Sequence, residues 1–346
     1  MKVGLIDIDS KMPENLPLMK ISAAEKIAGN TTQLIKGKPM LIEFMGFDRY
    51  YASCVFSKNK PYAEYLAKKG VIVGGYGYNG AKLPDNIEHL TPDYDLYGMK
   101  RSIGYKTRGC ARNCPWCVIP VMEGQTHSHA PLSEFHHPDH KRIILLDGNI
   151  LADKPSFKDA WEYIVQNGLQ VCFLQGLDIR LVDEEIAGML ADCDCRSLSF
   201  KERRIYIAFD TPRIEKELRA GVQHLVDAGI PSRELMAYML CGDPWNHPNG
   251  YDFSVDYHRF EVLLGLGVDP YVMKFNGRRD IRILNHFSRW VIRRDYKRKR
   301  PKYLRPREWE ELQEAIEKVE TGSKRTQGTQ VRQGEGEGES LSVRSP

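Results

Sequence analysis

A regular alternation of short apolar runs with amphipathic segments is the feature that most constrains the fold of this chain. In its larger, later part, six apolar runs are each followed by a segment with helical spacing of its apolar residues. Such alternation is typical of α/β proteins, in which helices join parallel strands. The predicted strands are residues 103–107, 142–146, 169–174, 204–209, 235–240 and 269–274. Six βα units are too few for a closed eight-fold barrel, so we expect a partial (βα)6 barrel of the TIM type.

The first hundred residues show the same alternation on a smaller scale. Strands are expected at residues 3–8, 32–35, 50–56 and 71–74, with helices at 17–29 and 62–69. Short apolar runs without strict alternation suit parallel strands that are covered on both faces. The expected fold class is therefore α/β, with a small N-terminal Rossmann-like open domain followed by the partial barrel.

The composition of the chain suggests four segments. We expect an N-terminal α/β domain at residues 1–98, the barrel at 99–295, a basic extension with a helix at 296–320, and a tail at 321–346. Residues 84–99 lack periodicity and are interpreted as a linker. From residue 321 onward Gly, Ser, Gln, Lys, Arg and Glu dominate, and a segment with so few apolar residues is expected to be disordered.

Charge and hydropathy limit the class of protein further. Hydrophobic residues make up 42% of the chain, and no apolar run approaches the roughly 18 residues of a membrane span. The acidic residue Asp7 comes too early for the apolar core of a signal peptide. The sequence therefore predicts a cytoplasmic protein with no membrane partner.

Residues 274–307 differ from the rest of the chain in charge. Fourteen Lys and Arg stand against two Asp, which gives this segment +12 and leaves −8 for the remainder of a chain with net charge +4. Four aromatic residues lie among these cations: Phe287, Trp290, Tyr296 and Tyr303. This mixture suits a nucleic-acid partner through phosphate neutralisation and base stacking. A solvated, partly helical end with basic side chains explains it about as well.

Three of the eight cysteines fall within eight positions. Cys110, Cys114 and Cys117 directly follow the predicted strand 103–107, in a loop shaped by Gly109 and Pro115. Thiolates are preferred ligands of iron–sulfur clusters and of zinc. Three thiolates leave one iron of a four-iron cluster without a protein ligand, and an open coordination position is typical of a catalytic metal centre. Arg108, Arg112 and the backbone amides of the loop are expected to stabilise added negative charge.

The pattern Cys110-x-x-x-Cys114-x-Trp116-Cys117 resembles the signature of the radical SAM superfamily. The resemblance covers about residues 99–294, because the βα series also fits the partial barrel of that family. It implies that the three cysteines hold a [4Fe-4S] cluster, which binds S-adenosylmethionine and cleaves it to a 5′-deoxyadenosyl radical that abstracts hydrogen from a substrate. It also implies a reducing electron donor such as a flavodoxin or ferredoxin. Methylation and rearrangement of the substrate both remain open.

The resemblance also implies residues that contact S-adenosylmethionine on loops after the strands. The candidates are Asp147, Asn149, Gln175, Asp178, Arg180 and Asp210. Most of them have a structural alternative: an ordinary Asp-Gly turn for the first pair, and a salt bridge or helix cap for Asp178 and Arg180. For Asp210, which precedes Thr211 and Pro212, the helix cap is favoured.

The N-terminal segment is similar to the cobalamin-binding domains that precede some radical SAM barrels. The Asp-x-His-x-x-Gly motif found in many of them is absent, so cobalamin is suggested by architecture alone. Gly75-x-Gly77-x-x-Gly80 matches a dinucleotide fingerprint in form, but no helix follows it, and we reject that function. Methylthiolation, which normally needs a second cluster in the N-terminal domain, is disfavoured because Cys54 is the only cysteine before Cys110.

A zinc-dependent nucleic-acid-binding module without catalysis is the alternative from a different class. It would use the three cysteines and His127 or His129 as ligands. The loop around these residues carries five histidines, His127, His129, His136, His137 and His140, for which ordinary solvated positions are favoured over a second metal or a proton relay. Cys241 is expected to be an inert buried thiol, and Cys193 and Cys195 to be structural.

Overall fold

The computed structural model describes residues 1–9, 14–40 and 46–333, and within them the protein is α/β with parallel sheets. The expected fold class is thus confirmed at this level. The chain divides into two compact units. The first consists of Met1–Ile207 and Ala220–Leu235, and the second of Ala208–Arg219 and the chain from Met236 on.

The first unit begins with a parallel sheet in the order β2-β1-β3-β4. Its elements are β1 (Lys2–Asp7), α1 (Leu16–Ile27), β2 (Thr31–Lys36), β3 (Arg49–Ser53), α2 (Lys60–Lys68) and β4 (Ile72–Gly74). All four strands and both helices are predicted from the sequence. Helix α1 begins where the side chain of Asn15 accepts the N–H of Leu18, a typical N-cap.

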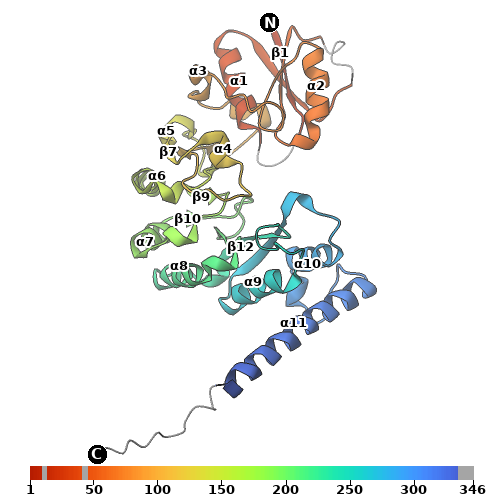
Figure 1. Cartoon of the computed structure of the whole chain (residues 1–346). Coiled ribbons are helices and arrows are strands. Elements are labelled where there is room, and N and C mark those ends of the chain that lie inside the picture. The colour runs from red at the N-terminus through yellow and green to blue at the C-terminus, as the bar shows by residue number, and fades with distance from the viewer. Residues whose placement is uncertain (10–13, 41–45, 334–346) are drawn as a thin grey trace, which may run out of the picture. The chain divides into compact units, whose positions relative to one another are not determined.

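Both faces of this sheet are covered by a helix. Val3 and Leu5 of β1 pack with Leu18 of α1, whereas Ile6, one residue out of phase, belongs to a cluster that includes Leu66 of α2. Successive side chains of a strand point to opposite faces, so this division follows from the run of apolar residues. Accordingly, α1 and α2 lie on opposite sides of the sheet (Figure 1).

The segment predicted as a linker is more ordered than its sequence suggests. It holds α3 (Asp85–Glu88) and the 3₁₀ turn η3 (Tyr94–Tyr97). Tyr94 is buried and donates its hydroxyl hydrogen to the carbonyl of Phe135. A single helical turn has too few residues to produce a detectable period, so periodicity could not predict these turns.

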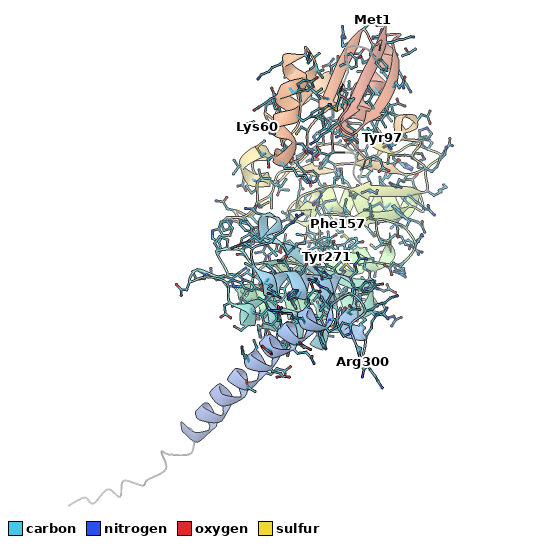
Figure 2. The ribbon with its side chains drawn as sticks, turned by 90° about the vertical axis from the view of Figure 1, so that its right-hand side faces the viewer. Met1, Lys60, Tyr97, Phe157, Tyr271 and Arg300 are labelled. Carbon is cyan, nitrogen blue, oxygen red and sulfur yellow. The ribbon has the colours of Figure 1, made fainter. Side chains whose placement is uncertain are left out.

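A second parallel sheet of the first unit has the order β10-β9-β8-β5. The elements that build and follow it are β5 (Ser102–Gly104), β6 (Thr107–Arg108), α4 (Ile119–Glu123), β7 (His127–Ser128), α5 (Leu132–Phe135), β8 (Arg142–Leu145), α6 (Lys154–Gln166), β9 (Gln170–Phe173), α7 (Glu184–Asp192), β10 (Asp194–Cys195) and β11 (Ile205–Ala208). Phe157 of α6 is fully buried and lies 6.1 Å from Phe173 of β9 between ring centroids (Figure 2). Leu177 forms a parallel bridge with Ile207.

The predicted strand 103–107 is divided in the structure. Parallel pairing with β8 ends at Gly104, and Thr107 and Arg108 pair antiparallel with β7 instead. The carboxylate of Asp147 explains the break, because it accepts the backbone N–H groups of Lys106 and Thr107 that would otherwise continue the ladder.

The second unit contains the parallel pair β12 (Leu235–Cys241) and β13 (Asp269–Lys274), whose bounds match the last two predicted strands closely. Its helices are α9 (Phe253–Gly265), α10 (Arg282–Ile292) and α11 (Pro306–Gln333), while α8 (Glu215–Asp227) begins in this unit. Arg259 of α9 is fully buried, and its guanidinium donates to the carbonyls of Phe209 and Leu240 and pairs with Asp256 at 2.5 Å. This pairing offsets the cost of burying both charges.

Helix α11 extends into the segment that is predicted to be disordered. Its first residue is Pro306, and proline is favoured at the first position of a helix. The helix continues beyond residue 321 to Gln333. Helix formation needs only local hydrogen bonds, and Lys, Arg and Gln favour it even where no core is available. The remainder of the predicted tail, residues 334–346, lies outside the described residues.

In the part of the chain that the structure describes, no helix is both long enough and apolar enough to cross a membrane.

Candidate metal centre

The loop that carries the three cysteines is closed at its base by the antiparallel pair β6 and β7. Thr107 pairs with Ser128 and Arg108 with His127, so residues 109–126 form one excursion from the end of the second sheet. The N–H of Cys110 donates to the carbonyl of Gly124 at 3.0 Å, which fastens the two ends of the loop together. The loop is therefore a constrained structure on an ordered base.

Gly109 makes this closure possible. Its φ of +76° is a conformation that side chains other than glycine rarely adopt, and a Cβ atom there would lie 2.2 Å from the carbonyl oxygen of Gln125. Glu123 also stabilises the base of the loop. Its Oε2 accepts the N–H of Gly109 at 3.0 Å, and its Oε1 pairs with Arg108 at 3.1 Å. Sequence reasoning missed Glu123, although an acidic residue in the same loop as Arg108 is a signal of such a pair.

The three cysteines differ in burial, and within the described residues they form no disulfide. Cys110 is buried, whereas Cys114 and Cys117 are half-buried and belong to one turn in which the N–H of Cys117 donates to the carbonyl of Cys114 at 3.0 Å. The sulfur of Cys110 accepts the backbone N–H of Arg112 at 3.4 Å and the side-chain amide of Asn149 at 3.7 Å. Such N–H donors stabilise negative charge on a ligand sulfur.

Asp178 connects the cysteine loop to the loop after β9. Its carboxylate accepts Nε of Arg112 at 2.8 Å, Nε of Arg180 at 2.6 Å and Nδ2 of Asn149 at 3.3 Å. Burial alone would raise the pKa of Asp178, but the hydrogen bonds and charges of Arg180 and Arg112 outweigh it and lower the pKa. Asp178 is thus an ionised organising group, and three residues from separate loops meet on it.

Arg180 is close enough to two of the cysteines to feel their charge. Burial would lower the pKa of its guanidinium, but the hydrogen bond and charge of Asp178, followed by the charges of Cys114 and Cys110, raise it.

Asn149 uses only one end of its amide group in contacts with the described residues. Its Nδ2 donates to Cys110 and Asp178, whereas no group among residues 1–9, 14–40 and 46–333 donates a hydrogen bond to its buried Oδ1. A buried polar atom without a partner is rare and costs free energy. An acceptor oxygen beside the sulfur of Cys110 is suited to a ligand that brings its own donor, such as an ammonium group.

Asp147, the other candidate of this pair, is occupied by its own chain. Its carboxylate accepts the N–H groups of Lys106 and Thr107 and the hydroxyl of Thr107, the last at 2.7 Å. Burial raises the pKa of Asp147 to about 6 against these hydrogen bonds, which lower it. The structure places Asp147 beneath the cysteine loop, where it fixes the path of the chain into β6.

Two further candidates do not join this cluster. Gln175 is exposed on the turn after β9. Asp210 belongs to the second unit, where its carboxylate accepts the N–H of Leu240 at 3.0 Å. The favoured interpretation of Asp210-Thr211-Pro212 as a helix cap is confirmed, with Thr211 as the capping residue. Thr211 is the N-cap of the 3₁₀ turn Pro212–Ile214, because its hydroxyl accepts the N–H of Arg213 at 3.4 Å.

The histidines of the loop are used in local packing. His127 is exposed and contacts the carbonyl of Gln125, and His129 lies 3.2 Å from Glu88. His136 contacts the hydroxyl of Tyr163, while His140 contacts the hydroxyl of Ser102. The prediction of solvated positions suits His127 alone, because His129, His136 and His137 are half-buried and His140 is buried. The remaining cysteines singled out from the sequence, Cys193, Cys195 and Cys241, are all buried.

Three of the four aromatic residues of the basic segment pack in the interior of the second unit, whereas Tyr303 is 42% exposed. Phe287 and Trp290 are buried against Phe260, and Tyr296 packs on the same ring at 5.4 Å between centroids. Many of the cations form ion pairs with acidic residues: Arg278, Arg282, Arg289, Arg294, Lys297, Arg298, Arg305 and Arg307. This packing favours a solvated, partly helical end over a base-stacking surface.

Whether the cysteine loop fits a metal group depends on its donor set. Among the described residues, no three His, Cys, Asp or Glu side chains are arranged to hold a single metal ion. A four-iron cluster makes a different demand, because each thiolate binds a different iron and the sulfurs surround the whole cluster. Three thiols on one loop, two N–H donors on Cys110 and the nearby cation of Arg180 fit an anionic iron–sulfur cluster.

Comparison of the sequence with known protein families finds no family model that matches, and comparison with curated proteins finds no match either. The interpretation of the site therefore depends on its own residues and their contacts.

Proposed function

We propose that this protein is a radical SAM enzyme, in which Cys110, Cys114 and Cys117 hold a [4Fe-4S] cluster. The observation that carries the proposal is the polar setting of the cysteine loop: Asn149 donates to the sulfur of Cys110, and Arg180 lies near the sulfurs of Cys110 and Cys114. A loop built only for structure would not need an unpartnered buried acceptor and a cation beside its thiols.

Reductive cleavage of S-adenosylmethionine to a 5′-deoxyadenosyl radical is the chemistry that the bound cluster would supply. The chain contributes the ligands and their surroundings. Arg180 supplies a positive charge near the cysteines, and Asp178 fixes Arg180 and Arg112 in position. The free Oδ1 of Asn149 is suited to accept a hydrogen bond from the amino group of the methionine moiety.

In this proposal the six predicted strands form a partial barrel, and an external reductant such as a flavodoxin or ferredoxin supplies the electron. The N-terminal sheet and its helices form a Rossmann-like domain in this proposal. Cobalamin binding by that domain is supported only by its architecture. The radical abstracts hydrogen from the substrate, and both methylation and rearrangement are compatible with the site.

Anaerobic reconstitution of the full chain with iron and sulfide, followed by reduction in the presence of S-adenosylmethionine, tests the proposal. We expect about four irons per chain, a brown colour and release of 5′-deoxyadenosine. Cys114→Ala should abolish the release. Cys54→Ala is the matched control, because it removes a thiol from the core of the first sheet and should leave the reaction unchanged.

The opposite results are equally clear. One colourless zinc per chain, retained by the wild type, would support the nucleic-acid-binding module instead of the enzyme. Intact S-adenosylmethionine in the presence of a fully loaded, reduced cluster would refute the enzymatic assignment.

A further inference from the structure

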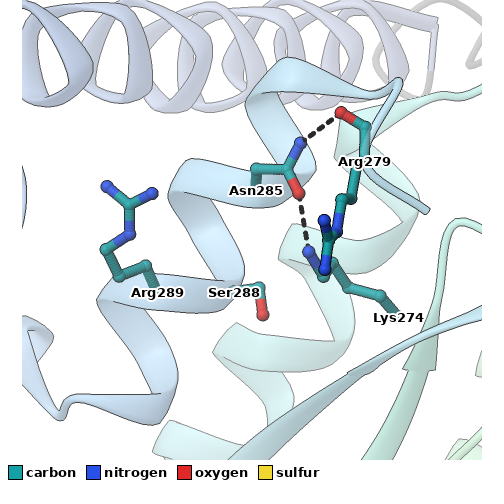
Figure 3. A pocket seen from close by; sticks show the side chains of 5 residues that line it. All are labelled: Lys274, Arg279, Asn285, Ser288 and Arg289. Atoms are coloured by element: carbon teal, nitrogen blue, oxygen red, sulfur yellow. Dashed lines mark hydrogen bonds between the residues drawn. The ribbon is translucent and has the colours of Figure 1, made fainter. Parts of the chain in front are cut away.

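An open pocket with a volume of about 430 Å³ lies in the second unit, between the end of β13 and helix α10. Its lining is almost entirely polar and basic: Lys274, Arg279, Asn285, Ser288 and Arg289 (Figure 3). Lys274 is the last residue of β13, and the final three come from α10. Neither the cysteine loop nor the proposed radical chemistry uses any of these residues.

Asn285 holds the ammonium group of Lys274 and the backbone of Arg279 in place. Its Oδ1 accepts Nζ of Lys274 at 2.6 Å, and its Nδ2 donates to the backbone carbonyl of Arg279 at 2.9 Å and to that of Ile281 at 2.8 Å. One amide side chain thereby fixes both the lysine and the backbone of the loop that carries the arginine (Figure 3). The basic lining is therefore a built arrangement rather than a chance meeting of flexible side chains.

The charge in the pocket is incompletely neutralised. Arg289 pairs with Glu308 at 2.8 Å, whereas no acidic side chain in the described part of the chain forms an ion pair with Lys274 or Arg279. Burial lowers the pKa of Lys274, and the charges of Arg279 and Arg289 lower it further. Cations that repel one another at a concave surface are relieved by a bound anion.

The donors in the pocket suit an oxyanion. A guanidinium offers paired N–H donors that match the geometry of phosphate oxygens, and an ammonium adds a point charge. The hydroxyl of Ser288, on the pocket side of α10, adds a neutral donor. We propose that this pocket binds the phosphate group of a small phosphate monoester, through Lys274, Arg279 and Ser288.

A small molecule fits the lining of the pocket better than a nucleic acid, because none of the five lining residues is aromatic. Phe275, which follows Lys274, packs edge-on with the partly exposed Trp245 at 5.4 Å between ring centroids, so the oligonucleotide probe below tests whether these rings stack on bases. The pocket volume leaves room for an organic group beyond the phosphate.

Isothermal titration calorimetry of the full chain, isolated without a cluster, tests this site separately from the radical chemistry. The probes are inorganic phosphate and glycerol phosphate. We expect both to bind, and Arg279→Gln and Lys274→Met each to weaken binding about tenfold or more, as expected for the loss of a charge-assisted hydrogen bond. Lys299→Gln removes the same charge from an exposed position of the same segment and should leave affinity unchanged.

Three results would overturn the proposal. Wild-type protein that binds neither probe has no such site. Equal weakening by Lys299→Gln would reveal general electrostatic attraction instead of a pocket. A single-stranded oligonucleotide that binds through Arg279, while glycerol phosphate does not bind, would identify a nucleic-acid surface. Because Arg279 is exposed, Arg279→Gln should fold normally and decides the matter even if Lys274→Met does not fold.

Discussion

Asp147 and Asn149 are close in the sequence but have different contacts in the structure. The position of Asp147 after a strand, followed by Gly148, predicts a contact with a cofactor. In the structure, its carboxylate oxygens instead accept hydrogen bonds from Lys106 and Thr107. The adjacent candidate Asn149 has the unpartnered oxygen. Spacing in the sequence places both residues at the carboxyl end of strand β8, where the cofactor contact is expected. Only the contacts distinguish the one that anchors the chain from the one that is open to a ligand.

The raised pKa of Asp147 predicts a pH dependence of stability. Burial raises this pKa from its ordinary value of 3.8 to about 6, so the folded protein binds the proton more tightly than the unfolded chain. The ionised group therefore costs stability above about pH 6, and the cost is relieved as the pH falls from about 6 toward 3.8. The full difference is on the order of 3 kcal/mol.

Urea denaturation of the wild type and of Asp147→Asn at pH 4.5 and pH 7.5 measures this effect. The variant loses an acceptor at both pH values, which gives a constant offset. The wild type should lose stability relative to the variant between the lower and the higher pH. A difference between the two proteins that is the same at both pH values would show that Asp147 titrates normally.

The elements of the fold differ in how well the sequence predicts them. Strands and helices with several apolar residues in phase, such as β13 and α2, are found near their predicted bounds. Elements of two to four residues, such as β6, β7 and α3, are not predicted, because they are held by contacts from distant segments. The cysteine loop depends on two of these short elements, so its closure is a property of the tertiary structure.

Gly109→Ala tests whether the closure of the loop matters for the metal group. The new Cβ would meet the carbonyl of Gln125 at 2.2 Å, and the positive φ adds about 1–2 kcal/mol of strain. We expect faster hydrogen exchange at the N–H of Cys110 and less than half of the wild-type iron content after reconstitution.

Gly168→Ala is the matched control. Gly168 also has a positive φ, of +58°, but no atom lies within 4 Å of the position that a Cβ would take. This variant should pay the conformational strain alone and keep its iron. Equal iron loss in both variants would show that general destabilisation, rather than the loop, controls loading.

Ion pairs neutralise much of the positive charge that residues 274–307 carry in the sequence. The segment with +12 contributes many of its cations to ion pairs with acidic residues of the second unit, including Asp269, Glu308 and Glu311. Phe287, Trp290 and Tyr296 pack together in the same unit, and only Tyr303 of the four aromatic residues is exposed. These acidic partners lie within the segment or directly beside it in the sequence, so its net charge overstates the positive charge that is left without a partner.

Binding to nucleic acid should accordingly be electrostatic and independent of the bases. In fluorescence anisotropy, a single-stranded oligonucleotide and an abasic strand of the same length should bind equally, with affinity that falls steeply with salt. Stacking is worth about 1–3 kcal/mol per base. Tighter binding of the base-containing strand by more than about tenfold would show that exposed rings take part.

The sequence by itself determined the α/β class, the order of the strands and helices, and the loop on which the three cysteines lie. These features depend on the periodicity of apolar residues and on local spacing, which the chain carries in every conformation. Tertiary structure alone decided the division of labour between Asp147 and Asn149, the meeting of Arg112 and Arg180 on Asp178, and the basic pocket around Asn285. Hydrogen bonds and burial between residues far apart in the chain arise only when folding brings those residues together, and no local pattern encodes them.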